Sequence, residues 1–175
     1  MALDAIAKLR AIQHSIDQCR KHIDELFAKH PDADIFTSLP GAGTKLAPRL
    51  LSDVGSQRDR YESALAVQQI SGVAPVTRAS GKSRHVRIRW ACRKEFRHDL
   101  YWLAFCSLKE STWARGFYDQ ARARGDSHAL ALRKLGYKLV RIIFRLWQDR
   151  RVYDEQHYLL SLQQHGSPLV AALPS

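Results

Sequence analysis

The segment IFTSLPGAGTKLAPRLLSDVG spans residues 35–55 and places Pro40, Gly41 and Gly43 between two short stretches of helical apolar periodicity. Proline and glycine are the strongest breakers of regular structure, so they mark a turn between two helices. The second stretch keeps one apolar face and ends at a glycine, as shown by Leu46, Leu50, Val54 and Gly55. We therefore expect a helix, a tight turn and a second helix.

The Leu-Pro-Gly-x-Gly pattern of residues 39–43 resembles the helix-hairpin-helix motif. Glycines let a backbone approach a phosphate closely, and free N–H groups at the start of a helix favour an anion. The alternative is a tight helix–helix turn with no ligand. Because a strongly basic segment follows in the chain, we favour phosphate binding by Gly41, Gly43 and Lys45.

Upstream of this motif, residues 1–30 carry apolar side chains at alternating spacings of three and four. The set consists of Ala2, Ala5, Leu9, Ile12, Ile16, Cys19, Ile23 and Leu26. This pattern is typical of a coiled coil, which would make the chain a homo-oligomer. A single amphipathic helix packed on its own domain is the alternative. Pro31 and the polar residues 32–34 end the helix.

Basic residues are concentrated downstream of the motif. APVTRASGKSRHVRIRWACRKEFR, residues 74–97, holds eight Lys or Arg and one acid, and residues 128–151 hold seven and one. The whole chain has a formal charge of +11 and a pI near 10.0. Such clustering indicates a polyanionic partner, with nucleic acid the commonest. An anionic membrane surface and a solvated basic face are the alternatives.

The periodicity of the remaining residues predicts an all-α fold, in which a coiled-coil helix at 1–30 precedes a compact helical domain at 35–155. We expect a loop at 77–83, a short extended piece at 86–90 and a loose tail at 156–175. Further helices are expected at 60–70, from about 88 to 108, at 111–124 and at 127–148.

Ser80 and Gly81 lie inside the first basic segment. A serine hydroxyl is a poor nucleophile unless a base or a positive field activates it, although most Ser-Gly pairs only make turns. The candidate nucleic-acid ligands in this segment are Arg78, Lys82, Arg84, Arg87, Arg89 and Arg93. On the last long helix they are Lys134, Lys138, Arg141 and Arg145, at a spacing that forms a basic stripe beside an apolar one.

Several other classes of protein lack support. The three cysteines form neither a Cys-x-x-Cys pair nor a Cys/His cluster, so we expect no zinc site, no disulfide framework and a reducing cytoplasm. No signal peptide or spanning apolar run is present, so we expect no membrane association by insertion. No histidine begins the His-x-x-Arg motif of tyrosine recombinases, and no carboxylates gather as a two-metal nuclease requires. A base-excision glycosylase without an iron–sulfur cluster remains a weak alternative.

The order of several short motifs resembles the C-terminal transposase domain of the IS110/IS116/IS902 insertion-sequence family over about residues 35–155. These motifs are the residue 39–43 pattern, Gly72-Val73-Ala74-Pro75, Ser80-Gly81, Arg97 with Leu100-Tyr101, Tyr118, Arg124-Gly125 and Tyr153-Asp154.

This resemblance implies an RNA-guided DNA recombinase in which the serine of the Ser-Gly motif, here Ser80, forms a covalent link to DNA. It implies DNA and a guide RNA as partners, assembly through the coiled coil at residues 1–30, and a bacterial, nucleoid-associated location. The family also has an N-terminal RNase H-like domain with an Asp-Glu-Asp-Asp magnesium site. No counterpart is found in this chain, so we expect no cofactor here and a partial transposase, inactive alone. A non-catalytic nucleic-acid-binding or dominant-negative regulatory module is the alternative.

Overall fold

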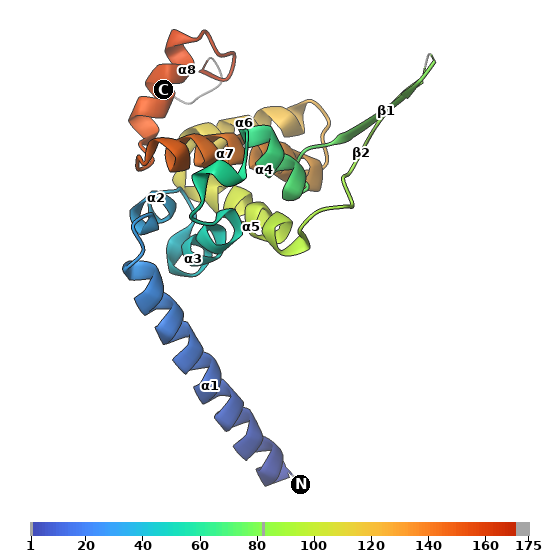
Figure 1. The fold of residues 1–175 in the computed structure, drawn as a ribbon. Helices are drawn as coiled ribbons and strands as arrows, with labels where there is room; N and C mark the ends of the chain where they lie inside the picture. The colour runs from blue at the N-terminus through green and yellow to red at the C-terminus, as the bar shows by residue number, and fades with distance from the viewer. Residues whose placement is uncertain (1, 82, 171–175) are drawn as a thin grey trace.

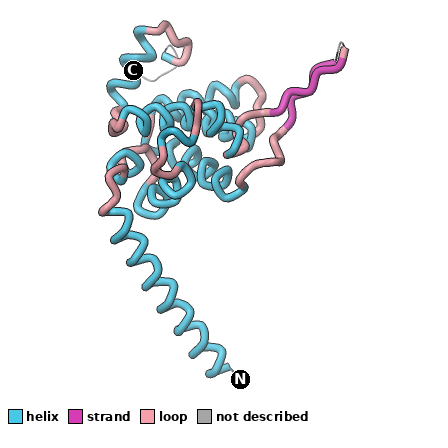
Figure 2. Tube along the Cα trace, in the orientation of Figure 1, coloured by secondary structure: helices cyan, strands magenta, loops and turns pink. Residues whose placement is uncertain are grey.

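The computed structural model describes residues 2–81 and 83–170, without the side chains of Ala2, Leu3, Arg78 and Arg84. Within that part of the chain, eight α-helices and one two-stranded sheet confirm the all-α prediction (Figures 1 and 2). The elements are α1 (Ala2–Ala28), α2 (Ala33–Thr37), α3 (Gly43–Val54), the 3₁₀ turn η1 (Arg58–Arg60), α4 (Ala64–Ile70), β1 (Val76–Ser80), β2 (Ser83–Arg87), α5 (Lys94–Glu110), α6 (Thr112–Ala123), α7 (His128–Asp149) and α8 (Glu155–Gln164).

Helix α1 extends away from the other helices as an isolated rod (Figure 1). Its apolar seam is open to solvent, with Leu9 66% exposed, Ile12 56% and Ile23 52%. An apolar stripe on a helix requires a partner, because exposed large apolar groups cost free energy in water. Coiled-coil pairing through this stripe stays a prediction.

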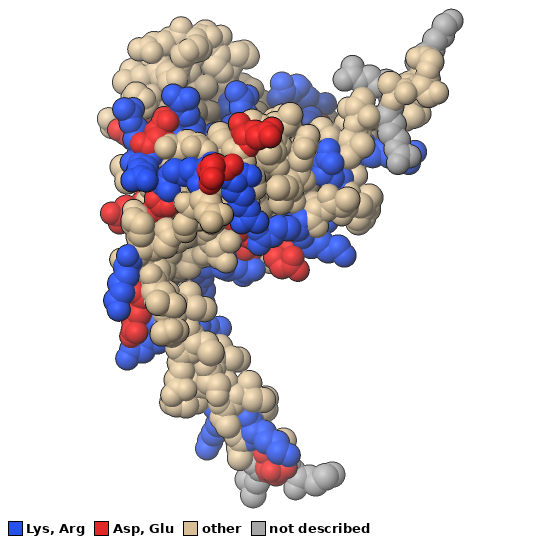
Figure 3. All heavy atoms as spheres, viewed as in Figure 1, with Lys and Arg blue, Asp and Glu red and all other residues tan. Residues whose placement is uncertain are grey.

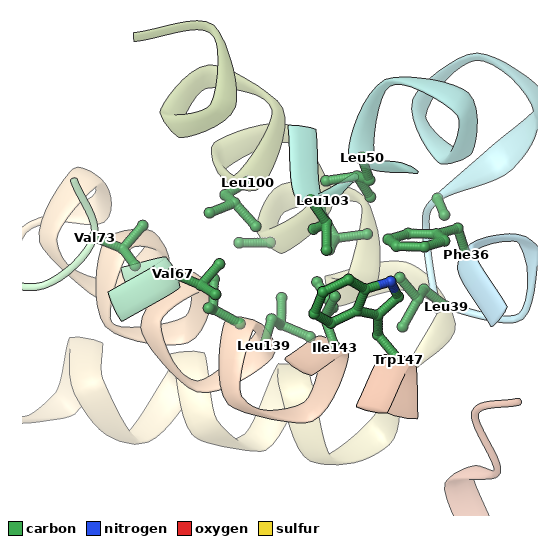
Figure 4. Close-up of a cluster of buried hydrophobic side chains, with 14 of the residues drawn as sticks. Phe36, Leu39, Leu50, Val67, Val73, Leu100, Leu103, Leu139, Ile143 and Trp147 are labelled. Atoms are coloured by element: carbon green, nitrogen blue, oxygen red, sulfur yellow. The ribbon is translucent and has the colours of Figure 1, made fainter. Parts of the chain in front are cut away.

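The core is built around α7, whose buried side chains meet α4, α5 and α6. Figure 4 shows Leu139, Ile143 and Trp147 of α7 beside Leu100 and Leu103 of α5. These five side chains are at most 2% exposed. The apolar face of α7 is therefore buried in the core, and its basic residues lie on the other faces of the helix.

The turn between α2 and α3 packs tightly on α5. Gly41 has a φ of 80°, and a Cβ there would lie 2.6 Å from the backbone of Cys106 and Ser107. Its N–H donates to the Glu110 carboxylate at 2.6 Å. Gly41 is thus required for close helix packing.

Residues 76–87 form an antiparallel β-hairpin that projects from the helical body (Figure 2), so the predicted loop at 77–83 is wrong. Ser80 pairs with Ser83, and Gly81 in the turn has a φ of 55°. The sequence was misjudged because strand alternation is masked when both faces carry polar residues. A two-residue turn containing glycine between β-compatible segments was the available signal.

Helix α5 begins at Lys94 and not near Ile88, which corrects the predicted start. The preceding residues return from the hairpin in an irregular path, and the Arg93 N–H donates to the Ile70 carbonyl at 2.8 Å. Gly72 permits this approach, because a Cβ there would lie 2.5 Å from the Cys92 sulfur. Ser111 is the N-cap of α6, because its hydroxyl accepts the Ala114 N–H.

The expected loose tail at 156–175 is wrong for residues 156–164, which belong to α8. Asp154 caps this helix by accepting the His157 N–H at 3.1 Å. Tyr158 packs against Trp113 with ring centroids 4.8 Å apart and the rings inclined by 56°, and Leu169 is buried. Weak amphipathicity hid α8 from sequence inspection, whereas the acidic cap was visible. Residues 171–175 lie outside the described part.

Candidate nucleic-acid interface

A groove of about 730 Å³ runs between the base of the hairpin and α7. We call it the basic groove; its lining includes Arg87, Arg89, Arg133, Lys134, Lys138 and Arg141, together with Phe117 and Tyr137. Among the described residues, none of those that line it is Asp or Glu. On the face of the helical body seen in Figure 3, Lys and Arg outnumber Asp and Glu. A concave surface of a single charge attracts polyanions.

Lys138 is a half-buried cation of this groove. Its ammonium lies 5.2 Å from the ring centroid of Phe117 and 5.5 Å from that of Trp113. Burial lowers the pKa of Lys138, and the neighbouring Arg141 lowers it further. Aromatic faces attract a cation, but they do not neutralise it. An anion bound in the groove would relieve the repulsion between Lys138 and Arg141.

Arg133 and Arg89 show the same shortage of counter-charge. Burial lowers the pKa of Arg133, and Arg97 adds repulsion. The Nε of Arg89 is buried without a hydrogen-bond partner among the described residues. A buried donor left unpaired costs free energy, which an oxygen ligand would recover. Both observations favour a phosphate as the occupant of the groove.

Other predicted ligands lie elsewhere. Arg93 is bound to Asp53, with 2.8 Å between its guanidinium and the carboxylate, so it holds α5 to α3. Arg145 pairs with Asp149 at 2.6 Å on the outer surface of α7. Lys134 lines the groove but is paired with Asp126 at 2.5 Å.

Ser80 lies at the exposed end of the hairpin, apart from the groove at its base (Figure 1). On the opposing strand, the Ser83 Oγ and the His85 Nε2 are 2.9 Å apart. A hydroxyl next to an imidazole is a pair that can exchange a proton. The side chains of Arg78 and Arg84, and the whole of Lys82, fall outside the described part.

The α2–α3 turn forms a separate surface. Gly43 and Lys45 are exposed and line a hollow of about 500 Å³ together with Arg49, His98 and Trp102. Gly41 also borders it, but its N–H is already bound to Glu110. Gly43 and Lys45 are therefore accessible to a ligand, whereas the Gly41 N–H is used in a contact within the fold. The helix-hairpin-helix assignment stays a prediction.

Sequence inspection missed three groove residues, Phe117, Arg133 and Tyr137. Arg133 and Tyr137 precede Arg141 at intervals of four, so following the face of Arg141 backwards for two helical turns would have found them. Phe117 packs against the core and is only partly buried. Its position beside Lys138 depends on how α6 packs on α7, which no local pattern encodes.

In the described ranges no three His, Cys, Asp or Glu side chains gather as metal ligands would. Of the helices described, none is sufficiently long and apolar to cross a membrane.

Comparison with known proteins identifies relatives of one kind. Residues 33–119 match the family described as Transposase IS116/IS110/IS902 family. A mini-circle protein of Streptomyces coelicolor named as a transposase for IS117 is 32% identical over 162 residues, 93% of this chain and 39% of that protein. An uncharacterized 42 kDa protein of insertion element IS900 from Mycobacterium paratuberculosis is 28% identical over 163 residues, 87% of this chain and 40% of that protein.

The uncharacterized 43.6 kDa protein of insertion element IS110 from Streptomyces coelicolor is 27% identical over 151 residues, covering 86% of this chain and 37% of the relative. The chain thus spans about two fifths of the length of these relatives. The family match falls on α2 to α6 and includes the α2–α3 turn and the hairpin that carries Ser80. The chain belongs to the transposase IS116/IS110/IS902 family.

Proposed function

We propose that this chain is a DNA-binding part of an insertion-sequence transposase and acts in DNA transposition and recombination through a serine nucleophile. The basic groove carries the proposal: several cations, two of them partly desolvated beside another cation, line a concave surface that holds no acid. Such a surface suits the phosphate backbone of DNA. Family membership supports the role in transposition.

In this proposal the hairpin carries Ser80 to the scissile phosphate. The Ser80 oxygen attacks phosphorus, a serine–phosphate ester forms, and the bond from phosphorus to the leaving sugar oxygen breaks. The proton lost by the serine ends on that oxygen, so a free hydroxyl is released. An exposed hairpin tip suits this task, because the phosphate of a bulky duplex must reach the hydroxyl.

His85 is the candidate proton acceptor on the same hairpin. Ser80 stands opposite Ser83 in the strand register, and the Ser83 hydroxyl is hydrogen-bonded to the His85 ring. Directly opposed residues of an antiparallel pair project on the same face. A proton could therefore pass from Ser80 through Ser83 to the imidazole. Which ring nitrogen carries the proton at rest depends on the tautomer.

We further propose that α1 pairs with a second copy of the chain and that a guide RNA accompanies the DNA, in the bacterial cytoplasm. The exposed seam of Leu9, Ile12, Ile16 and Ile23 supports pairing, since each is at least 41% exposed. The guide RNA rests on the family resemblance. A magnesium site would be supplied by the additional domain that this resemblance implies.

A non-catalytic binding or regulatory module is the second candidate. Within the described residues, Ser80 has no base in direct hydrogen-bonding contact, which favours a chain that occupies DNA without cutting it. Dimerisation through α1 would then let it compete with a complete transposase.

The two candidates are separated by incubating the chain with supercoiled plasmid carrying the element's ends and its RNA. The reaction is run with and without a protein supplying a relative's metal domain. A covalent protein–DNA product that disappears in Ser80→Ala and persists in a Ser52→Ala control supports the nucleophile. Duplex binding with no covalent product under either condition would assign the regulatory role.

A further inference from the structure

Helix α5 presents an aromatic face to solvent, away from the core. Tyr101 is 37% exposed, Trp102 43% and Phe105 38%. The rings meet edge to face, with centroids 6.1 Å apart for Tyr101 and Trp102 and 5.7 Å apart for Trp102 and Phe105. Contiguous exposed aromatic side chains mark an interaction surface rather than ordinary solvent-facing residues.

These rings are held in place before any ligand binds. The Trp102 indole N–H donates to His98 Nε2 at 3.0 Å, and Phe105 contacts His128 with centroids 6.3 Å apart. The Nδ1 of His128 lies 2.8 Å from the Tyr118 hydroxyl. A ligand that stacks on this face therefore pays little entropy for ordering it.

Cations stand at the edge of the aromatic face. A cavity of about 360 Å³ is lined by Tyr101 and His98 together with Lys94, Arg97 and Arg133, and within the described part of the chain no acidic side chain lines it. Arg97 also lies over the ring of Trp90, 5.9 Å from its centroid. Arg133 borders both this cavity and the basic groove, so the positive surface is continuous between them.

We propose that the aromatic face of α5 stacks unpaired bases of single-stranded nucleic acid, whose phosphates lie against Arg97 and Arg133. The inference rests on the proposed nucleic-acid binding and adds a second surface, which shares Arg133 with the basic groove and takes unpaired bases instead of a duplex. In a duplex the base faces are hidden in the stack, so only unpaired bases can meet these rings. The adjoining acid-free cavity argues for a polyanion and against an apolar protein surface.

The test compares a short oligothymidylate with an abasic strand of equal length, each titrated against the full chain by fluorescence anisotropy. The chain should bind the strand with bases more tightly. Trp102→Ala should weaken that binding at least about fivefold and bring it to the abasic level. Phe105→Ala should act in the same direction. Leu160→Ala, at a 57% exposed position on α8, is the control and should change nothing.

Tryptophan emission gives an independent readout. Trp113 and Trp147 are fully buried, so in a Trp90→Phe background quenching by stacked thymine reports on Trp102. Thermal melting of each variant confirms that it is folded.

Three results would overturn the proposal. One is equal affinity for strands with and without bases; another is unchanged affinity in both folded variants. The third is loss of self-association in Trp102→Ala at constant affinity, which would make this face a protein interface. If neither a duplex nor any strand binds, the proposed function fails as well; if the duplex binds but bases add nothing, only the stacking site is lost.

Discussion

The Arg93 guanidinium lies 2.8 Å from the Asp53 carboxylate and also donates to the Asp53 carbonyl at 2.9 Å. Asp53 is 5% exposed, so this arginine joins α3 to the start of α5 at the base of the hairpin. Arg93, predicted as a nucleic-acid ligand, thus forms an ion pair that holds the fold together.

Removal of Arg93 should therefore reduce stability more than DNA affinity. Arg93→Ala leaves a buried carboxylate without its charge partner, and we expect a loss of about 2 kcal/mol in the free energy of unfolding. Urea denaturation measures it, with Lys94→Ala as the exposed neighbouring control. An equal effect of the two substitutions would contradict the structural role.

Asp53 should make stability depend on pH. Burial raises the pKa of its carboxyl from 3.8 to about 6; Arg93 opposes this shift and Asp99 adds to it. The folded protein thus keeps a proton that the unfolded chain has lost between these values. Its contribution to stability grows as pH falls through about 6 and is lost as pH rises through it.

Melting temperatures between about pH 4.5 and 7.5 test this dependence. Asp53→Asn should flatten the curve relative to the parent chain, whereas the exposed Asp59→Asn should leave its shape unchanged. The histidines contribute equally to all three proteins, so the difference isolates Asp53. Parallel curves for the parent and Asp53→Asn would rule out a raised pKa.

Tyr153 should stabilise the docking of α8. Its hydroxyl accepts the Trp113 indole N–H at 2.6 Å and donates to Glu155 at 3.0 Å. Tyr153→Phe leaves the buried Trp113 indole N–H without an acceptor. We therefore expect a loss of about 1–3 kcal/mol in the free energy of unfolding. Tyr158→Phe is the matched control, since that hydroxyl makes no hydrogen bond within the described ranges. Chemical denaturation measures the free energy of unfolding of each variant. Equal losses in Tyr153→Phe and Tyr158→Phe would refute this role.

The α1 seam should govern self-association. Ile12→Asp with Ile16→Asp places charges on the exposed apolar stripe and should convert an oligomer to a monomer in sedimentation velocity. Lys21→Asp, on an exposed part of the same helix, should leave the distribution unchanged. If the unsubstituted chain is monomeric over a wide range of concentration, the predicted coiled-coil pairing of α1 is wrong.

The sequence was informative where one periodicity dominates. The apolar stripes of α1 and α7 predicted both helices nearly to their ends. The hairpin was not predicted because both faces of its strands carry polar residues, so the sequence shows no alternation of apolar and polar positions. The pairing of the two strands is visible only in the structure. Of the six cations in the basic groove, only Arg133 was not predicted as a ligand. Arg93 was predicted as a ligand because its pairing with Asp53 depends on a contact between residues forty positions apart.

The salt dependence of duplex binding tests the basic groove most directly. Arg87→Ala, Lys138→Ala and Arg141→Ala should each weaken affinity for any sequence and lower the slope of log K against log salt by about 0.9 per lost phosphate contact. Lys8→Ala, on an exposed part of α1, should change neither quantity. Unchanged slopes in all three groove variants would contradict the central claim that this groove holds the DNA backbone.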